Sequence, residues 1–281
     1  MTGYVEAIIF MLAINIVLAL AAYLPLAAGQ LNLGIAGFMA IGGYVSAYLT
    51  NTYGLSLGLG IACGASAAGL VALLLAIPIL RTSGIYLALA TFALGQLIQA
   101  VFLNLEPVGA AAGYSVSKFA GFWLVVGTAL GTLLVVFMLT RTRFALYLTA
   151  TKNDPLVTEL FGVNIKAIQV AAFSLGAVLA GLGGALYAHH YSSLEPQYFS
   201  VMLSIYVVLY VLLGGTQTIV GPLIGATLFT LLPEILRGSE QWRHVFFAIF
   251  LLLVMAIQPQ GIVTAHLLRR LNPFRRKGSV L

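Results

Sequence analysis

The sequence predicts an all-α fold: a polytopic transmembrane helix bundle of about eight to ten spans, some broken or short, with no soluble domain. Of the 281 residues, 61% are hydrophobic and only 7% are charged, and the mean hydropathy is +1.06. A water-soluble fold could not bury that much apolar surface. The apolar residues also form runs close to the ~20 residues that a helix needs to cross a bilayer core of roughly 30 Å. We therefore expect residues 1–281 to form a single transmembrane domain.

Nine apolar runs are predicted as membrane segments. The second, seventh and eighth are shorter than usual spans, so they are half-helices, steeply placed segments or spans whose polar ends lie buried in protein. Glycine-rich interruptions at Ala27–Gly34 and Leu212–Gly221 predict broken helices, which membranes tolerate where the backbone is buried or lines a wet path. In order, the nine segments are Ile8–Leu26, Ile35–Leu49, Leu55–Ile79, Ile85–Leu105, Phe122–Thr140, Ile168–Tyr187, Val201–Leu213, Leu223–Leu232 and Val245–Ile257.

Small residues recur at four-residue steps within these segments. This spacing places them on one helix face, where they allow two backbones to approach closely, and it predicts a tightly packed bundle. The rows are Gly176, Ala180 and Gly184; Gly60, Gly64 and Ala68; and Gly221 with Gly225.

The longest hydrophilic stretch between two apolar runs is Arg141–Gln169, and we expect residues 141–167 within it to form a loop outside the hydrocarbon. Short loops rich in Lys and Arg tend to stay in the cytoplasm. A cytoplasmic 141–167 loop gives nine spans with the N-terminus outside and a basic cytoplasmic tail at 266–281. The inner face then collects ten of the thirteen basic residues: Arg81, Arg141, Arg143, Lys152, Lys166, Arg269, Arg270, Arg275, Arg276 and Lys277. The outer face collects five of the seven acids: Glu6, Glu106, Glu195, Glu234 and Glu240.

Asp, Glu, Lys and Arg are missing from the middle of every predicted span. A proton- or sodium-coupled carrier usually needs such a residue to load and release its coupling ion, so the sequence disfavours that class. The chain also contains no Walker A loop, G-x-S-x-G or H-E-x-x-H motif. We therefore expect no catalytic residue, metal site or cofactor, and any driving energy must come from another polypeptide. The adjacent His189 and His190 diverge by ~100° on a helix, which favours an interfacial anchor over a metal site.

Polar side chains enter the predicted bilayer at Gln30, Asn32, Gln96, Gln99 and Asn104, and all of these except Asn104 are candidates for a translocation path. They either form interhelical hydrogen bonds that fix the packing or line the path. Gln96 and Gln99 lie three residues apart and are therefore expected to share a helix face. The four candidates are Gln30, Asn32, Gln96 and Gln99.

From Leu31 to the tail, the chain resembles the permease subunits of ABC importers of the branched-chain amino acid type, closest to the LivM-like half of the pair. Four blocks carry the resemblance, in the family's order: LNLGIAGFMAIGGYVSAYL, LRTSGIYLALATFALGQLI, NDPLVTELFGVNIKAIQVAAFSLGAVLAGLGGALYA and GGTQTIVGPLIGATLFTLLPEILR. The third block resembles the loop by which importer permeases dock on their ATPases.

Within the third block, Asp154, Glu159 and Gly162 match the acid, acid and glycine of that coupling loop. The two small residues usual between the acids are replaced by Val157 and Thr158. Local chemistry favours a short helix at the same place, since an Asp-Pro pair starts a helix well and a glycine ends one in the left-handed conformation. We expect this helix to run from Pro155 to Phe161.

The resemblance implies a permease that moves branched-chain amino acids, or a related small polar solute, across the bacterial inner membrane. It implies a second, LivH-like permease subunit, two cytoplasmic ATP-binding subunits that use the ATP, and a periplasmic solute-binding protein. The alternative is an ATP-independent channel or facilitator for a small neutral solute such as urea or amides. A facilitator would have no use for the short helix that is flanked by Asp154 and Gly162.

Overall fold

The structure is a computed structural model that describes residues 2–235 together with 248, 249, 252, 254, 256, 258 and 261–263. Within these residues the chain is almost entirely helical, as predicted. Two short strands, β1 (Tyr114–Ser115) and β2 (Ser193–Leu194), pair antiparallel. The α-helices are α1 (Thr2–Ala27), α2 (Ile35–Thr52), α3 (Leu57–Ile79), α4 (Ile85–Asn104), α5 (Phe122–Thr140), α6 (Arg143–Asn153), α7 (Pro155–Leu160), α8 (Ile165–Tyr191), α9 (Val201–Gly214) and α10 (Val220–Ile235). Three 3₁₀ turns, η1 (Glu106–Val108), η2 (Ala110–Ala112) and η3 (Pro196–Phe199), complete the described elements.

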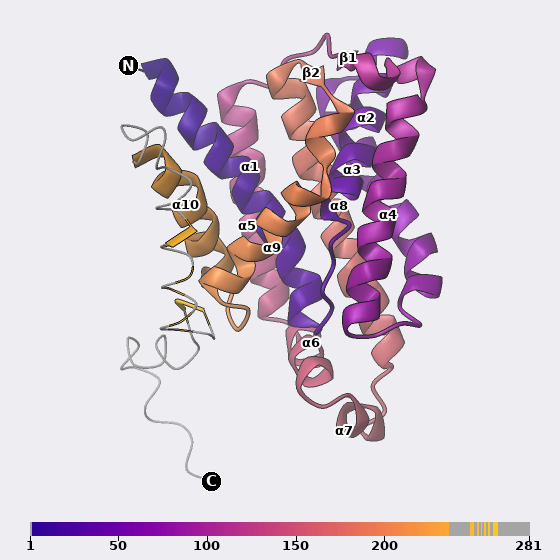
Figure 1. The fold of residues 1–281 in the computed structure, drawn as a ribbon, viewed down its shortest axis with the longest axis vertical. Helices are drawn as coiled ribbons and strands as arrows, with labels where there is room; N and C mark the ends of the chain where they lie inside the picture. Colours follow the sequence, from indigo (N-terminus) through magenta and orange to yellow (C-terminus); the bar gives the residue numbers. More distant parts are fainter. Residues whose placement is uncertain are drawn as a thin grey trace.

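Figure 1 shows the helices arranged as a bundle whose two ends differ. The N-terminus and the β1–β2 pair lie at one end, and α6 and α7 project from the other. We call these the outer and inner ends, following the predicted orientation. In the part of the chain that the structure describes, five helices are long and apolar enough to cross a membrane, namely α1, α3, α4, α5 and α8, and α9 and α10 are shorter apolar helices.

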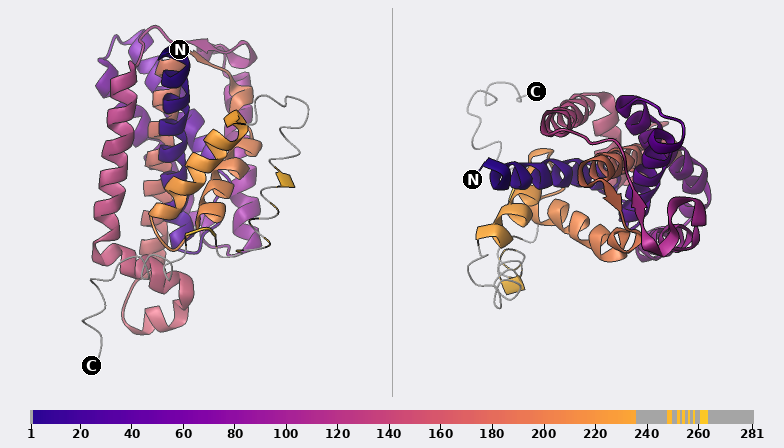
Figure 2. Two further views of the ribbon diagram at one scale, coloured as in Figure 1. Left: turned by 90° about the vertical axis from the view of Figure 1, so that its left-hand side faces the viewer. Right: turned by 90° about the horizontal axis from the view of Figure 1, so that it is seen from above.

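The long helix α8 lies at the centre of the bundle and packs against α1, α2 and α3. The turned views in Figure 2 show α1 crossing the bundle obliquely beside it. The contact between α2 and α8 depends on glycine, because a Cβ atom at Gly184 would overlap the carbonyl oxygen of Met39. A Cβ at Gly225 would likewise overlap the carbonyl oxygen of Tyr210, where α9 meets α10. The close packing predicted from the small-residue rows is confirmed at both places.

The two predicted helix interruptions are present. The first, which we call the helix break, comprises residues 28–34 between α1 and α2, with Gly29 at a φ of +79°. The amides that open α2 are satisfied from neighbouring helices: Leu33 N donates to Thr91 Oγ1 at 3.0 Å, and Ala36 N donates to Ser204 Oγ at 2.9 Å. Because its start is buried and held by α4 and α9, α2 begins within the protein. The second interruption, the turn at 215–219, separates α9 from α10.

Eight of the nine predicted segments correspond to helices, and α5 has the predicted limits. The predicted ninth segment, 245–257, lies mostly outside the described residues, and the basic tail at 266–281 lies wholly outside them. The hydrophilic stretch differs from its prediction as a loop with one short helix. It contains two helices, α6 and α7, because the buried Leu148 and Thr151 anchor α6 to the bundle.

Candidate coupling site

The short helix α7 forms where the Asp-Pro pair predicts it. Asp154 precedes the helix, and its Oδ1 accepts a hydrogen bond from Val157 N at 3.0 Å, while Pro155 occupies the first turn. Gly162 N donates to the carbonyl oxygen of Glu159 at 2.9 Å, and Gly162 has a φ of +78°. The capped start and the left-handed end are the expected ones. Together they hold a six-residue helix that would be marginal in isolation.

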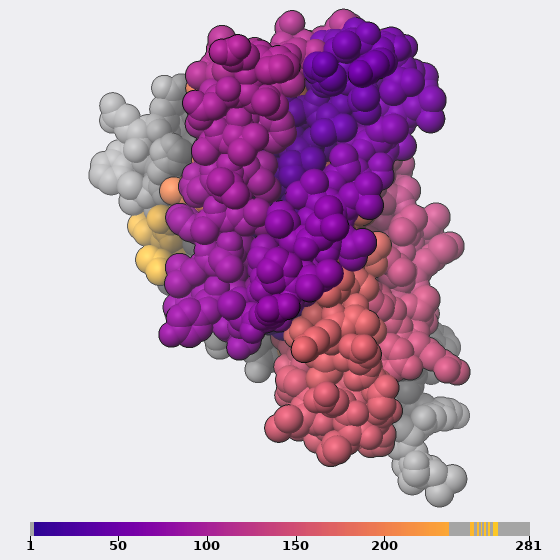
Figure 3. Space-filling view, turned by 90° about the vertical axis from the view of Figure 1, so that its right-hand side faces the viewer, coloured from indigo at the N-terminus to yellow at the C-terminus, as the bar shows by residue number. Residues whose placement is uncertain are grey.

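The surface of α7 carries large apolar side chains that the chain itself does not cover. Leu156 is 76% exposed, Leu160 87% and Phe161 82%. Figure 3 shows this segment projecting from the inner end of the bundle, beyond the long helices. Exposed apolar groups gathered outside the membrane spans mark a surface for contact with another protein.

The two residues that depart from the family pattern face different ways. Thr158 is buried, and its Oγ1 donates to the carbonyl oxygen of Asp154 at 2.7 Å. Val157 is 45% exposed. Of the two replacements, only Val157 lies on the exposed side of α7, while Asp154 and Glu159 are both exposed.

The last turn of α6 joins α7 to the bundle at what we call the inner junction, formed by Gly29, Gln30, Thr151, Lys152 and Thr216. Lys152 Nζ donates to Thr216 Oγ1 at 2.8 Å. A Cβ atom at Gly29 would lie 3.5 Å from both Cα and Cγ of Lys152, which is ordinary van der Waals distance. Desolvation by the surrounding protein lowers the pKa of Lys152. The inner junction therefore brings α6, the helix break and the turn at 215–219 together.

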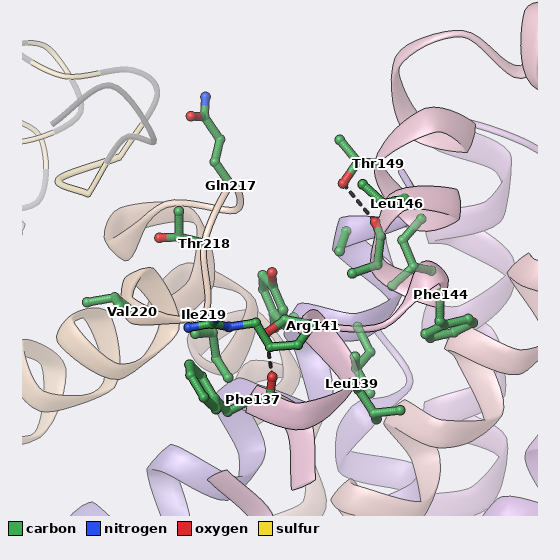
Figure 4. Close-up of a pocket in the computed structure, with 16 residues that line it drawn as sticks. Phe137, Leu139, Arg141, Phe144, Leu146, Thr149, Gln217, Thr218, Ile219 and Val220 are labelled. Carbon is green, nitrogen blue, oxygen red and sulfur yellow. Dashed lines mark hydrogen bonds between the residues drawn. The ribbon is translucent and has the colours of Figure 1, made fainter. Parts of the chain in front are cut away.

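A cavity of about 660 Å³ lies beside the inner junction. Figure 4 shows Gln217 and Thr218 of the turn on one side of it and Leu146 and Thr149 of α6 on the other. The inner ends of α1 and α5 complete its lining. Arg141 and Phe137 also line the cavity, and the Arg141 guanidinium lies over the Phe137 ring, 4.8 Å from its centroid.

The four predicted path residues do not gather in one place. Gln30 and Asn32 share the helix break; Asn32 Oδ1 accepts from Gly34 N at 2.8 Å. Gln30 is 1% exposed, and neither atom of its amide group has a hydrogen-bond partner among the described residues. Gln99 Nε2 donates to the carbonyl oxygen of Pro196 at 3.1 Å, whereas Gln96 is exposed on the surface of α4. Gln96 and Gln99 thus lie in different surroundings, since residues three apart still differ by ~60° in direction around a helix.

At the outer end, His189 has a role that the sequence did not suggest. An interfacial anchor was expected, but the ring is completely buried. Its Nδ1 lies 2.9 Å from the carbonyl oxygen of Lys118, and its Nε2 lies 2.9 Å from Ser46 Oγ. Because a carbonyl can only accept, Nδ1 carries the proton and Nε2 accepts from the Ser46 hydroxyl. His189 therefore ties α8 to α2 and to residues 105–121 between α4 and α5, which we call the outer loop, while His190 stacks on Phe10.

Further contacts make the outer loop a fixed cap over α2. Asn51 Nδ2 donates to the carbonyl oxygen of Ser115 at 2.7 Å, and Asn51 Oδ1 accepts from Ser117 N at 3.0 Å. Lys118 Nζ donates to the carbonyl oxygens of Gly54 and Leu55. These contacts join residues more than sixty positions apart, so no local pattern in the sequence predicts them.

Comparison with known proteins gives a consistent result. Residues 4–257 match the family described as branched-chain amino acid transport system, permease component. The high-affinity branched-chain amino acid transport system permease protein LivM of Escherichia coli K12 is 26% identical, over 91% of this chain and 67% of that protein. The ribose import permease protein RbsC of the same organism is 25% identical, over 87% of this chain and 82% of that protein. LivH of Salmonella typhimurium LT2 is 26% identical over 56% of this chain and 51% of that protein. No solved structure matches significantly.

Proposed function

Because the chain belongs to the family of branched-chain amino acid transport system permease components, we propose that it carries branched-chain amino acids, or a related small polar solute, across a bacterial inner membrane. The chain is a membrane-embedded permease subunit of an ABC importer. The alternative of an ATP-independent channel or facilitator for urea or amides is not supported, since the relatives are components of ABC importers.

The proposed contact with the ATP-binding subunits is α7, and its exposed apolar surface is the observation that carries the proposal. Burying a side chain such as Leu156, Leu160 or Phe161 in an interface contributes about 1.5–3 kcal/mol, offset in part by the entropy lost on association. The exposed carboxylates of Asp154 and Glu159 flank these groups and would orient the contact electrostatically. Gly162 gives the turn that lets the chain leave α7 and enter α8.

The transport cycle that we propose is alternating access. Binding of ATP closes a pair of cytoplasmic ATP-binding subunits, α7 moves with them, and the permease pair opens outward. A LivH-like second permease subunit completes the pair, and a periplasmic binding protein delivers the solute to the outer end. Hydrolysis of ATP resets the assembly. We propose that the permease itself needs no cofactor and contributes the path and the coupling surface.

The helix break contributes to the proposed path. Gln30 and Asn32 place amide groups in a buried, uncharged segment, and an amide can both donate to and accept from an amino acid. Gln96 and Gln99 on α4 are also proposed path residues; Gln96 is exposed on the surface of α4, whereas Gln99 Nε2 donates to the carbonyl oxygen of Pro196. A path with few charges suits a solute that passes through without a strong binding step.

Assembly with the ATP-binding subunits tests the proposed coupling site. The chain would be co-expressed with candidate ATP-binding subunits and purified in mild detergent as the native protein and as Asp154→Lys, Glu159→Lys and Gly162→Pro. We expect the native complex to co-elute and the three variants to lose ATPase association or coupling. Glu106→Lys, a charge reversal at the outer end, is the control and should co-elute normally. Normal co-elution and coupling of all the α7 variants would refute the assignment.

Uptake into vesicles tests the substrate. With the binding protein and ATP present, labelled leucine should be taken up, while ribose should not. Uptake of ribose but not of leucine would indicate that the chain is a sugar permease, since the chain is 25% identical to RbsC and 26% identical to LivM.

A further inference from the structure

We propose that Lys152 is a positioning residue that transmits movement of α7 to both interrupted helix segments, the helix break and the turn at 215–219. The inference rests on the proposed function of α7 as the contact with the ATP-binding subunits. Beyond docking, Lys152 would carry a movement of α7 at the surface of the inner end to the helix break and to the turn at 215–219.

The first step of this linkage is the connection of α7 to α6. A single residue, Asp154, both ends α6 and caps the start of α7: its N–H donates to the carbonyl oxygen of Ala150 at 3.0 Å, and its side chain accepts from Val157 N. Thr158 adds a hydrogen bond to the carbonyl oxygen of Asp154. With no flexible linker between them, a push on α7 displaces the last turn of α6.

The second step is the contact of that turn with both interruptions. The backbone and stem of Lys152 lie beside Gly29, at the start of the helix break, where a Cβ atom on Gly29 would be 3.5 Å from both Cα and Cγ of Lys152. The ammonium group of Lys152 donates to Thr216 in the turn at 215–219. The two segments are nearly 190 positions apart in the chain. Lys152 thus lies beside the helix break and is hydrogen-bonded to the turn at 215–219, so displacement of the last α6 turn moves the two segments together.

The third step is the state of the polar groups at the inner junction. Thr151 Oγ1 and both polar atoms of the Gln30 side chain are buried without a hydrogen-bond partner among the described residues. Buried polar groups without partners are unfavourable, so a second arrangement that supplies partners competes with this one. The inner junction is therefore suited to rearrange when α6 moves.

The cavity beside the inner junction provides space for this rearrangement. Its walls include α6 and residues 217–220, and the hydrogen bond between Lys152 and Thr216 joins the same two elements. We therefore expect α6 and the turn at 215–219 to move as one body relative to the inner end of α5.

The first test separates transmission from docking. Lys152→Met and Thr216→Val each remove one partner of the hydrogen bond, and the double variant tests whether they act through the same contact. Lys166→Met, which removes an exposed lysine at the start of α8, is the matched control. Each would be assembled with the ATP-binding subunits and assayed for co-elution, ATP hydrolysis and solute transported per ATP.

We expect both single variants to co-elute normally and to transport less solute per ATP, by about threefold, the size expected for one net hydrogen bond. The double variant should be no worse than either single variant, and Lys166→Met should match the native protein. Unchanged transport per ATP would overturn the proposal. Loss of co-elution in Lys152→Met would also overturn it, because Lys152 would then act in docking, whereas loss of co-elution in the α7 variants alone concerns the proposed function.

The second test asks whether α6 and the turn move together. Lys152→Cys and Thr216→Cys would be combined in a Cys63→Ala background and joined by a short thiol cross-linker. If the two elements move as one body, the cross-linked protein should keep the transport rate of the same protein before cross-linking. Arrest of transport by the cross-link, reversed when a cleavable linker is reduced, would show that the elements must separate and would overturn the proposal.

Discussion

The surroundings of three helix glycines predict three different effects for the same substitution, and the destabilising one lies at the close contact between α2 and α8. Gly184→Ala places a Cβ on the carbonyl oxygen of Met39, a backbone atom that cannot turn away. Gly183→Ala places a Cβ 3.1 Å from Cδ2 of Leu18, the end of a flexible side chain. Gly131→Ala, on α5, meets nothing within 4 Å. The three changes are chemically identical, so their differences report on packing alone.

The magnitudes follow from two opposing terms. Replacing Gly by Ala inside a helix favours folding by about 1 kcal/mol, and all three positions gain this. Overpacking a well-filled site costs about 1–3 kcal/mol, and Gly184 bears the full cost because the two backbones must separate. We therefore expect Gly131→Ala to be stabilising, Gly183→Ala near neutral and Gly184→Ala destabilising. A difference of about 2 kcal/mol between the first and last corresponds to roughly 4–8 °C in unfolding midpoint.

The assay is thermal unfolding in detergent at a single heating rate, followed by the fraction of protein that remains monodisperse. A common heating rate is needed because membrane proteins often unfold irreversibly. If Gly184→Ala and Gly131→Ala shift the midpoint in the same direction by the same amount, the backbone contact between α2 and α8 does not exist and the packing account fails.

Three further substitutions test local features of the structure. Asp154→Ala removes the cap of α7 and should weaken that helix by about 1 kcal/mol, whereas Asp154→Asn should retain the cap. Hydrogen exchange of the α7 amides measures the stability of the helix, and equal protection of these amides in both variants would contradict the role of Asp154 as a cap. His189→Ala removes two buried hydrogen bonds worth about 1–3 kcal/mol together and should expose the outer loop to proteases. An unchanged cleavage pattern would refute the claim that His189 holds the outer loop on α2 and α8. Asn15 Nδ2 donates to Thr230 Oγ1 at 2.9 Å between α1 and α10; Asn15→Leu should lower the unfolding midpoint, and adding Thr230→Val should recover part of the loss.

The membrane helices could be predicted from the sequence because their signal is local. The length and composition of Phe122–Thr140 give the limits of α5, and the Asp-Pro and glycine signals give the caps of α7. The glycine rows also indicated where backbones approach closely, since four-residue spacing places small residues on one face of a helix.

The remaining features depend on contacts between distant parts of the chain. The helix α6 has a short polar sequence, RFALYLTATKN, and is held by tertiary contacts of Leu148 and Thr151 that no local pattern reveals. The pairing of β1 with β2 joins two-residue strands about eighty positions apart. The three-residue spacing predicts that Gln96 and Gln99 share a helix face, but only Gln99 reaches the 3₁₀ turn η3, whose position the sequence does not specify.

Site-directed cross-linking tests most directly whether α7 contacts the ATP-binding subunits. Leu160→Cys, in a Cys63→Ala background, would be assembled with the ATP-binding subunits and treated with a short cross-linker, with Glu106→Cys at the outer end as the control. We predict a cross-linked product with an ATP-binding subunit for Leu160→Cys, formed to a different extent with and without ATP, and none for Glu106→Cys. Absence of that product in an assembled, transporting complex would contradict the account.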